Sequence, residues 1–89
     1  MYVLMIAYAK NGELDFRIHD EYAFASLREA QLAIENQWEL DLENSDVWVE
    51  ELSPEQREDL FPKQISEMFF RCEKIPGYDF VEYQIVEEV

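Results

Sequence analysis

The chain has 89 residues, with 21 Asp or Glu against 7 Lys or Arg, so its formal net charge at pH 7 is −14. Hydrophobic residues make up 48% of it, which excludes the composition of disordered chains and predicts one small domain spanning 1–89. So acidic a chain is repelled by nucleic acid and by anionic lipid, so neither is expected as a direct partner. The expected partners are basic proteins or metal ions.

The lone cysteine and the N-terminal segment bear on location. A single cysteine, Cys72, excludes an intrachain disulfide and makes a cytoplasmic location the expectation. The apolar segment Tyr2–Ala9 has no basic residue before it and no small-residue cleavage site after it, which argues against a signal peptide. It is also far shorter than the roughly 20 apolar residues that cross a bilayer.

The N-terminal part of the chain predicts a β-hairpin. Tyr2–Ala9 is almost wholly apolar, as in a central strand buried on both faces. Asn11-Gly12 is typical of a type I′ turn, in which both residues have positive φ. The return strand alternates, and we expect its polar face to be the solvated one. Its apolar side chains are Leu14, Phe16 and Ile18, and its polar ones are Glu13, Asp15, Arg17 and His19.

A long amphipathic helix is predicted next, from Leu27 to Asn44. Ser26 followed three residues later by Glu29 has the spacing of a capping box. Apolar residues then recur near the 3.6-residue period and predict a buried stripe of Leu27, Ala30, Ile34 and Trp38.

Three further elements are predicted between positions 47 and 73. Val47–Leu52 has the pattern of a short strand. A second helix begins after Ser53, with Pro54 at its first position and Gln56 completing a capping box. A residue before proline avoids the α region, so we expect a break near Phe61. A further helix is predicted for the range 62–73, with Ile65, Met68, Phe69 and Cys72 facing inward.

The last element, Phe80–Val86, alternates again and predicts a strand with Val81, Tyr83 and Ile85 on one face. The order β-β-α-β-α-α-β indicates an α+β domain: a mostly antiparallel four-stranded sheet with helices packed on one face. Tyr2–Ala9 is the best candidate for its centre. The sheet would run second, first, third, and the partner of the last strand stays open.

No catalytic or metal-binding pattern is present, so neither an enzyme nor a cofactor is expected. His19 is predicted to be a solvated side chain and Cys72 a small buried hydrophobe rather than a reactive thiol. The acidic stretch 41–46 lacks the glycine and the final glutamate of a calcium loop, which favours a helix end followed by a solvated turn. A divalent-metal or small-molecule enzyme is the least favoured function.

The acidic residues themselves carry the functional hypothesis. On a helix, residues four apart lie about 6 Å apart, so Glu35, Glu39 and Glu43 should form a ladder of mutually repelling carboxylates. A second cluster is Glu50, Glu51, Glu55, Glu58 and Asp59. DNA carries about one phosphate per 3.4 Å of axis on each strand, so such rows could imitate a phosphate backbone before a basic groove. The plainer interpretation is a solvated face that serves solubility alone.

Trp48 is the remaining candidate. If Val47 and Val49 face the core, Trp48 lies on the other side of the sheet beside carboxylates, which would suit a protein-binding hot spot, although helices or a dimer partner could equally cover it.

Small, acidic, single-domain chains without enzyme motifs resemble in composition the accessory proteins of phages and other mobile elements, including inhibitors of CRISPR and restriction nucleases. The first hypothesis is therefore a non-enzymatic inhibitor or modulator that binds the basic surface of a nucleic-acid-binding protein. The alternative is a structural or assembly module that forms a homodimer through an edge strand or the Trp48 face, with the charge serving solubility.

Overall fold

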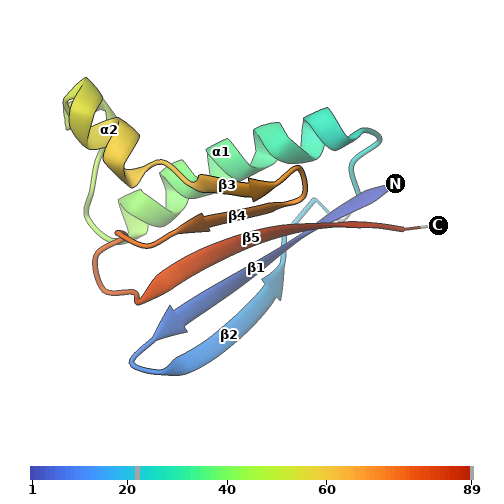
Figure 1. The fold of residues 1–89 in the computed structure, drawn as a ribbon, viewed down its shortest axis with the longest axis horizontal. Helices are drawn as coiled ribbons and strands as arrows, with labels where there is room; N and C mark the ends of the chain where they lie inside the picture. Colours follow the sequence, from blue (N-terminus) through green and yellow to red (C-terminus); the bar gives the residue numbers. More distant parts are fainter. Residues whose placement is uncertain (22, 89) are drawn as a thin grey trace.

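The structure, a computed structural model, describes residues 1–21 and 23–88. Its elements follow in the order β1 (Tyr2–Lys10), β2 (Glu13–Ile18), α1 (Leu27–Asn44), the 3₁₀ turn η1 (Val49–Glu51), α2 (Pro54–Leu60), β3 (Lys63–Ser66), β4 (Phe69–Cys72) and β5 (Phe80–Glu87) (Figure 1).

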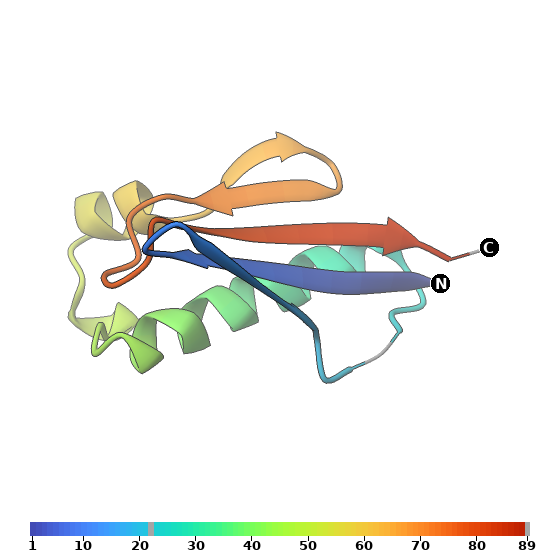
Figure 2. The same ribbon diagram turned by 90° about the horizontal axis from the view of Figure 1, so that it is seen from below.

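Within these residues, five strands form one antiparallel sheet in the order β2-β1-β5-β4-β3. Helix α1 passes behind the strands in Figure 1, and Figure 2 shows it along one side of the sheet. The α+β class is confirmed, but the sheet has five strands in the described residues instead of the four that were predicted. None of the helices in the described residues is long and apolar enough to cross a membrane.

The prediction is wrong for two segments. The expected strand Val47–Leu52 is a 3₁₀ turn, η1, entered from a chain reversal at Asp46, whose φ is 60°. The expected helix over 62–73 is the β3–β4 hairpin, and of the side chains expected to face inward, Cys72 is buried but Ile65 is 57% exposed. The apolar residues of this segment fit a helical period, but Phe70 and Cys72 also fit the two-residue period of a strand. β4 takes up that period by pairing with β5, which is remote in sequence.

This hairpin also changes the position of the first strand. β1 lies inside the sheet, between β2 and β5, but the middle strand is β5. The prediction that the first strand is the centre, with the third strand beside it, is therefore wrong. The last strand fills the place expected for the third, and Val81, Tyr83 and Ile85, which were predicted to share one face, are all buried.

The local signals for turns and helix ends are confirmed. Asn11 and Gly12 both have positive φ, 53° and 79°. Ser26 accepts a hydrogen bond from the Glu29 amide and caps α1, while the Glu29 carboxylate accepts from the amide of Ala25 instead of Ser26, so the first capping box is half formed. Both hydrogen bonds of the second capping box are present, and the chain leaves α2 at Phe61 with extended backbone.

The core lies between α1 and the covered face of the sheet. Trp38 is fully buried there, and its Nε1 donates to the carbonyl of Leu60 over 2.9 Å, which fastens α1 to the end of α2. The predicted stripe of α1 is confirmed: Ala30, Ile34 and Trp38 are buried, and Leu27 packs against the core from its edge.

β2 alternates as predicted, but its orientation is the reverse of the one expected. Arg17 reaches toward α1 and donates to Oε1 of Gln37 over 3.0 Å, so the polar side of β2 is the helix side. The apolar side chains face the uncovered side of the sheet: Leu14, Phe16 and Ile18 are 53%, 66% and 51% exposed.

Candidate functional site

The predicted ladder on α1 is partly neutralised by α2. The guanidinium of Arg57 lies 3.7 Å from Glu35 and 3.8 Å from Glu39, and 5.9 Å from the ring centroid of Trp38. α2 is brought there because Trp38 bonds the last carbonyl of that helix. The expectation of three uncompensated, repelling carboxylates is therefore wrong for two of them, and Glu43 is the member without an ion pair in the described part of the chain.

The second predicted cluster is also divided. Asp59 is paired with Lys74, whose Nζ lies 2.8 Å from Oδ1. The other four side chains are exposed and take part in no ion pair within residues 1–21 and 23–88: Glu50, Glu51, Glu55 and Glu58.

The fold explains why these four carboxylates share one end of the molecule. The amide of Val47 bonds the carbonyl of Leu42, which turns the chain back at the end of α1, and buried Val49 holds η1 there. The capping box of α2 follows directly. We refer to Glu43, Glu50, Glu51, Glu55 and Glu58 as the acidic end. It is the part of the predicted site that has no ion pair with any residue the structure describes.

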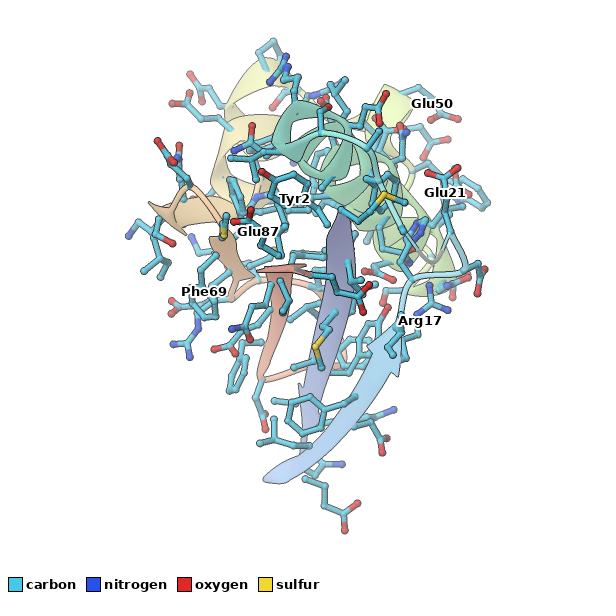
Figure 3. All side chains as sticks on the ribbon, turned by 90° about the vertical axis from the view of Figure 1, so that its right-hand side faces the viewer. Tyr2, Arg17, Glu21, Glu50, Phe69 and Glu87 are labelled. Carbon is cyan, nitrogen blue, oxygen red and sulfur yellow. The ribbon has the colours of Figure 1, made fainter. Side chains whose placement is uncertain are left out.

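Acidic side chains are not confined to this end. In Figure 3, the labelled Glu21, Glu50 and Glu87 lie at separate places on the surface. What distinguishes the acidic end is five carboxylates on three consecutive elements, without a cation among them except Arg57, which is turned toward α1.

Trp48 does not have the position predicted for it. It precedes η1 instead of lying on a strand, so it does not face the far side of the sheet. It is nevertheless 44% exposed and precedes Glu50 and Glu51 directly in the chain. An exposed tryptophan beside the acidic end therefore remains available for a contact.

Sequence reasoning missed a buried polar cluster between α1 and the sheet. Asp41 is 3% exposed, and its Oδ1 accepts hydrogen bonds from the Tyr8 hydroxyl over 2.8 Å and from Gln37 Nε2 over 3.0 Å. Its Oδ2 accepts from the Tyr83 hydroxyl over 2.7 Å. The sequence did contain a signal for this cluster. Ile34, Gln37, Trp38 and Asp41 share one face of a helix, so two polar side chains, Gln37 and Asp41, lie on the apolar face.

This cluster braces the fold and has no visible chemistry. Burial, followed by the charge of Asp41, raises the pKa of both Tyr8 and Tyr83, so both remain protonated donors at neutral pH. Arg17 extends the cluster through Gln37 toward solvent. A buried carboxylate whose two oxygens both accept hydrogen bonds from neighbouring side chains is a structural arrangement.

Cys72 and His19, the two residues considered for catalysis, both pack against neighbouring parts of the fold. Cys72 is buried, its Sγ lies 3.0 Å from the carbonyl oxygen of Leu60, and burial raises its pKa. That confirms a small buried side chain, on a strand instead of a helix. His19 is half-buried, not fully solvated: it accepts a hydrogen bond from the Glu21 amide and packs against Phe24.

No metal site or enclosed pocket adds a function. In the part of the chain that the structure describes, no three His, Cys, Asp or Glu side chains are placed to hold a metal ion. A groove of about 1340 Å³ lies between α2 and the β3–β4 hairpin, lined by both acidic and basic side chains. No family model, curated protein or solved structure matches this chain.

Proposed function

We propose that this chain is a non-enzymatic binding protein whose acidic end occupies the basic nucleic-acid-binding surface of another protein. The carboxylates take the place of backbone phosphates there. The proposed partner is a nuclease of a defence system, such as a CRISPR or restriction nuclease, and the chain an accessory protein of a phage or mobile element. Size and composition support the choice of partner class.

The observation that carries the proposal is the unpaired state of the acidic end. The fold brings cations to the other carboxylates of the predicted site: Arg57 to Glu35 and Glu39, and Lys74 to Asp59. At the acidic end it brings none, among the residues described. Like charges close together destabilise a fold, so a basic partner that neutralises them gains the most at this place.

The spacing of these carboxylates suits a phosphate-binding surface. Glu55 and Glu58 are three residues apart on α2, so their Cβ atoms lie about 5–6 Å apart. A partner's Lys and Arg side chains would exchange counterions for these carboxylates as they do for DNA, so binding should weaken steeply as salt rises. Trp48 offers an apolar contact at the edge of the same surface.

The test is a competition assay with two triple variants of equal net charge. The first variant, the acidic-end triple, replaces each of Glu50, Glu55 and Glu58 by Lys. The matched control replaces each of the exposed Glu13, Glu21 and Glu87 by Lys. The probe is a fluorescent DNA duplex bound to a purified restriction or CRISPR nuclease, across a panel of both. We expect the parent and the control to displace the duplex, and the acidic-end triple to do so at least about 10-fold less well.

Two results would contradict the proposal. One is a parent chain that displaces no duplex from any nuclease of the panel, even at low salt. The other is equal displacement by the two triples, because that would mean that total charge, and not the acidic end, decides binding.

The alternative function, an assembly module that dimerises through an edge strand or Trp48, makes a different prediction. Light scattering at two salt concentrations would find a dimer that is insensitive to salt, and the protein would have no affinity for basic proteins. β2 is an edge strand and Trp48 is exposed, so both contacts are accessible.

A further inference from the structure

The sheet has one face that α1 does not cover, and this open face is apolar over β1 and β2. Tyr8 and Arg17 point toward α1, so the residues that alternate with them point the other way. On the open face, these two strands form three directly opposed pairs, all apolar: Met5 with Ile18, Ala7 with Phe16, and Ala9 with Leu14. β5 adds Val86, which lies opposite Val3.

Antiparallel sheets with one solvated face normally carry polar residues on it. Here the charged residues of the β1–β2 hairpin, Lys10, Glu13, Asp15 and Arg17, all lie on the helix side, and Phe16 is exposed in the centre of the apolar side. An apolar patch of this kind on a small domain marks an interaction surface.

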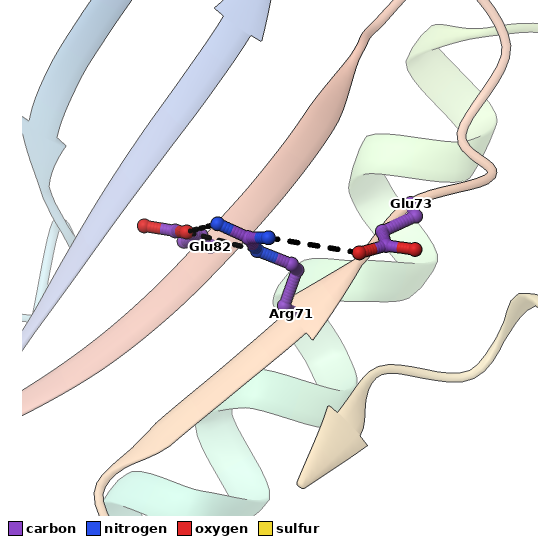
Figure 4. Close-up of polar contacts among 3 residues, drawn as sticks. All are labelled: Arg71, Glu73 and Glu82. Carbon is purple, nitrogen blue, oxygen red and sulfur yellow. Dashed lines mark hydrogen bonds and ion pairs between the residues drawn. The ribbon is translucent and has the colours of Figure 1, made fainter. Parts of the chain in front are cut away.

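The open face is also free of the charge excess that covers the rest of the molecule. Over β5 and β4, Glu82 is bound by Arg71, which also lies 3.6 Å from Glu73 (Figure 4). The same guanidinium lies 4.5 Å from the ring centroid of Phe80. Lys63 stands directly opposite Arg71 on the neighbouring strand. On this side of these strands the two carboxylates, Glu73 and Glu82, are therefore matched by two cations, Lys63 and Arg71, in a chain whose net charge is −14.

The open face is large enough for a stable interface. Across β2, β1, β5 and β4 it is about 19 Å wide; it is about 27 Å long at β5 and shortens to about 14 Å at the four-residue β4, from a strand spacing of about 4.8 Å and a rise of about 3.4 Å per residue. The side chains that stand on this area bring its accessible surface toward the roughly 800 Å² per partner that stable complexes bury.

We propose that the open face binds the open face of a second copy of this chain, so that two sheets pack into a homodimeric β-sandwich. The charge distribution selects this occupant. A basic partner is attracted to unmatched carboxylates, and the carboxylates on the strands of this face are matched by Arg71 and Lys63. Two highly anionic copies, in contrast, can approach closely only through a surface of low net charge. Sheets that pack face to face lie about 10 Å apart, with Phe16 near the middle of each apolar half.

The test is sedimentation equilibrium of the parent and three lysine variants. Phe16→Lys places a charge on the open face at the edge strand, and Val86→Lys places one on an inner strand, β5. Leu40→Lys is the matched control, because Leu40 is 52% exposed on α1 and lies away from the open face. All three variants carry the same net charge, which is less negative than that of the parent.

We expect the parent and Leu40→Lys to sediment as dimers, and the two open-face variants to associate at least about 100-fold more weakly, because an unpaired charge would be buried in an apolar contact. Dimerisation of the parent should strengthen from about 0.05 M to about 0.5 M salt, since salt screens the repulsion between copies. Circular dichroism of each variant checks that the monomer is folded, and both side chains are exposed in it.

The proposal is overturned if the parent is a monomer over about a hundredfold range of concentration, or if Phe16→Lys remains a dimer. It is also overturned if Phe16→Lys dissociates while Val86→Lys does not, because that result indicates pairing of edge strands rather than packing of faces. None of these measurements depends on a basic partner, so they stand apart from the competition assay.

Discussion

Replacing Tyr83 by phenylalanine tests whether the buried cluster braces the fold. The ring stays in the core, and only the hydroxyl that donates to Oδ2 of Asp41 over 2.7 Å is lost. Tyr8 and Gln37 both bond Oδ1, so Oδ2 of a buried carboxylate is left without a donor. Hydrogen bonds to charged groups contribute about 1.5–3 kcal/mol, so Tyr83→Phe should lower the free energy of unfolding by about 2 kcal/mol.

Tyr8→Phe is the matched comparison, because it removes a hydroxyl from the same carboxylate. Tyr8 is only partly buried and Oδ1 keeps Gln37 as a donor, so the expected loss is about 1 kcal/mol. Urea unfolding followed by tryptophan fluorescence measures both, since Trp38 is fully buried. For a domain of this size, a loss of about 2 kcal/mol lowers Tm by roughly 8–16 °C.

The same variant has a signature in alkaline solution. The pKa of Tyr83 is raised in the folded chain above its ordinary 10.0, so above pH 10 the unfolded chain binds fewer protons than the folded one. Its contribution to stability is therefore complete below pH 10 and is lost as pH rises further, by up to about 1.4 kcal/mol per pH unit. The parent should lose stability faster than Tyr83→Phe over this range.

Two outcomes would refute this reasoning. Either Tyr83→Phe unfolds within about 0.5 kcal/mol of the parent, which is the range of neutral substitutions, or Tyr8→Phe is the more costly change. Each would mean that Asp41 is satisfied by solvent and that the cluster does not brace α1 against the sheet.

Three further predictions concern other elements. Arg57→Ala should cost about 0.5–1 kcal/mol at low salt and less at high salt, because its two ion pairs are exposed; urea unfolding with no salt dependence would contradict this. The Cys72 thiol should react with a disulfide reagent far more slowly in the native chain than in urea, and equal rates would show that it is not buried. Gly12→Ala should cost about 1 kcal/mol through its positive φ alone, since an added Cβ would meet no atom within 4 Å; thermal unfolding at the parent's Tm would contradict the turn geometry.

Local signals predicted the parts of the fold that local chemistry decides. Asn11-Gly12, the cap of α1 and the capping box at Ser53 are short-range hydrogen-bonding or backbone features, and all three are confirmed. The break at Phe61 belongs with them, because proline restricts its own neighbour.

Long-range pairing decided the parts that were predicted wrongly. Phe70 and Cys72 lie on a strand because β5 offers them hydrogen bonds, and no local propensity reports that β5 is adjacent. Alternation in β2 correctly grouped Leu14, Phe16 and Ile18 on one face, but periodicity does not say which face a helix will cover. In the same way, the ladder on α1 looked uncompensated because Arg57 is 18 or more residues away in sequence from Glu35 and Glu39.

Three arrangements of charge bear on binding: an open face whose strand carboxylates are matched by cations, carboxylates paired through the fold, and an acidic end that has no ion pair within the described residues. The first and the last respond oppositely to salt. Docking of the acidic end on cations weakens as ions compete, whereas packing of two open faces strengthens as repulsion is screened. A salt titration of one protein thus separates the two surfaces. If raising the salt concentration strengthens the dimer and abolishes binding to a basic partner, the two activities belong to different faces. A single shared surface would gain or lose both together.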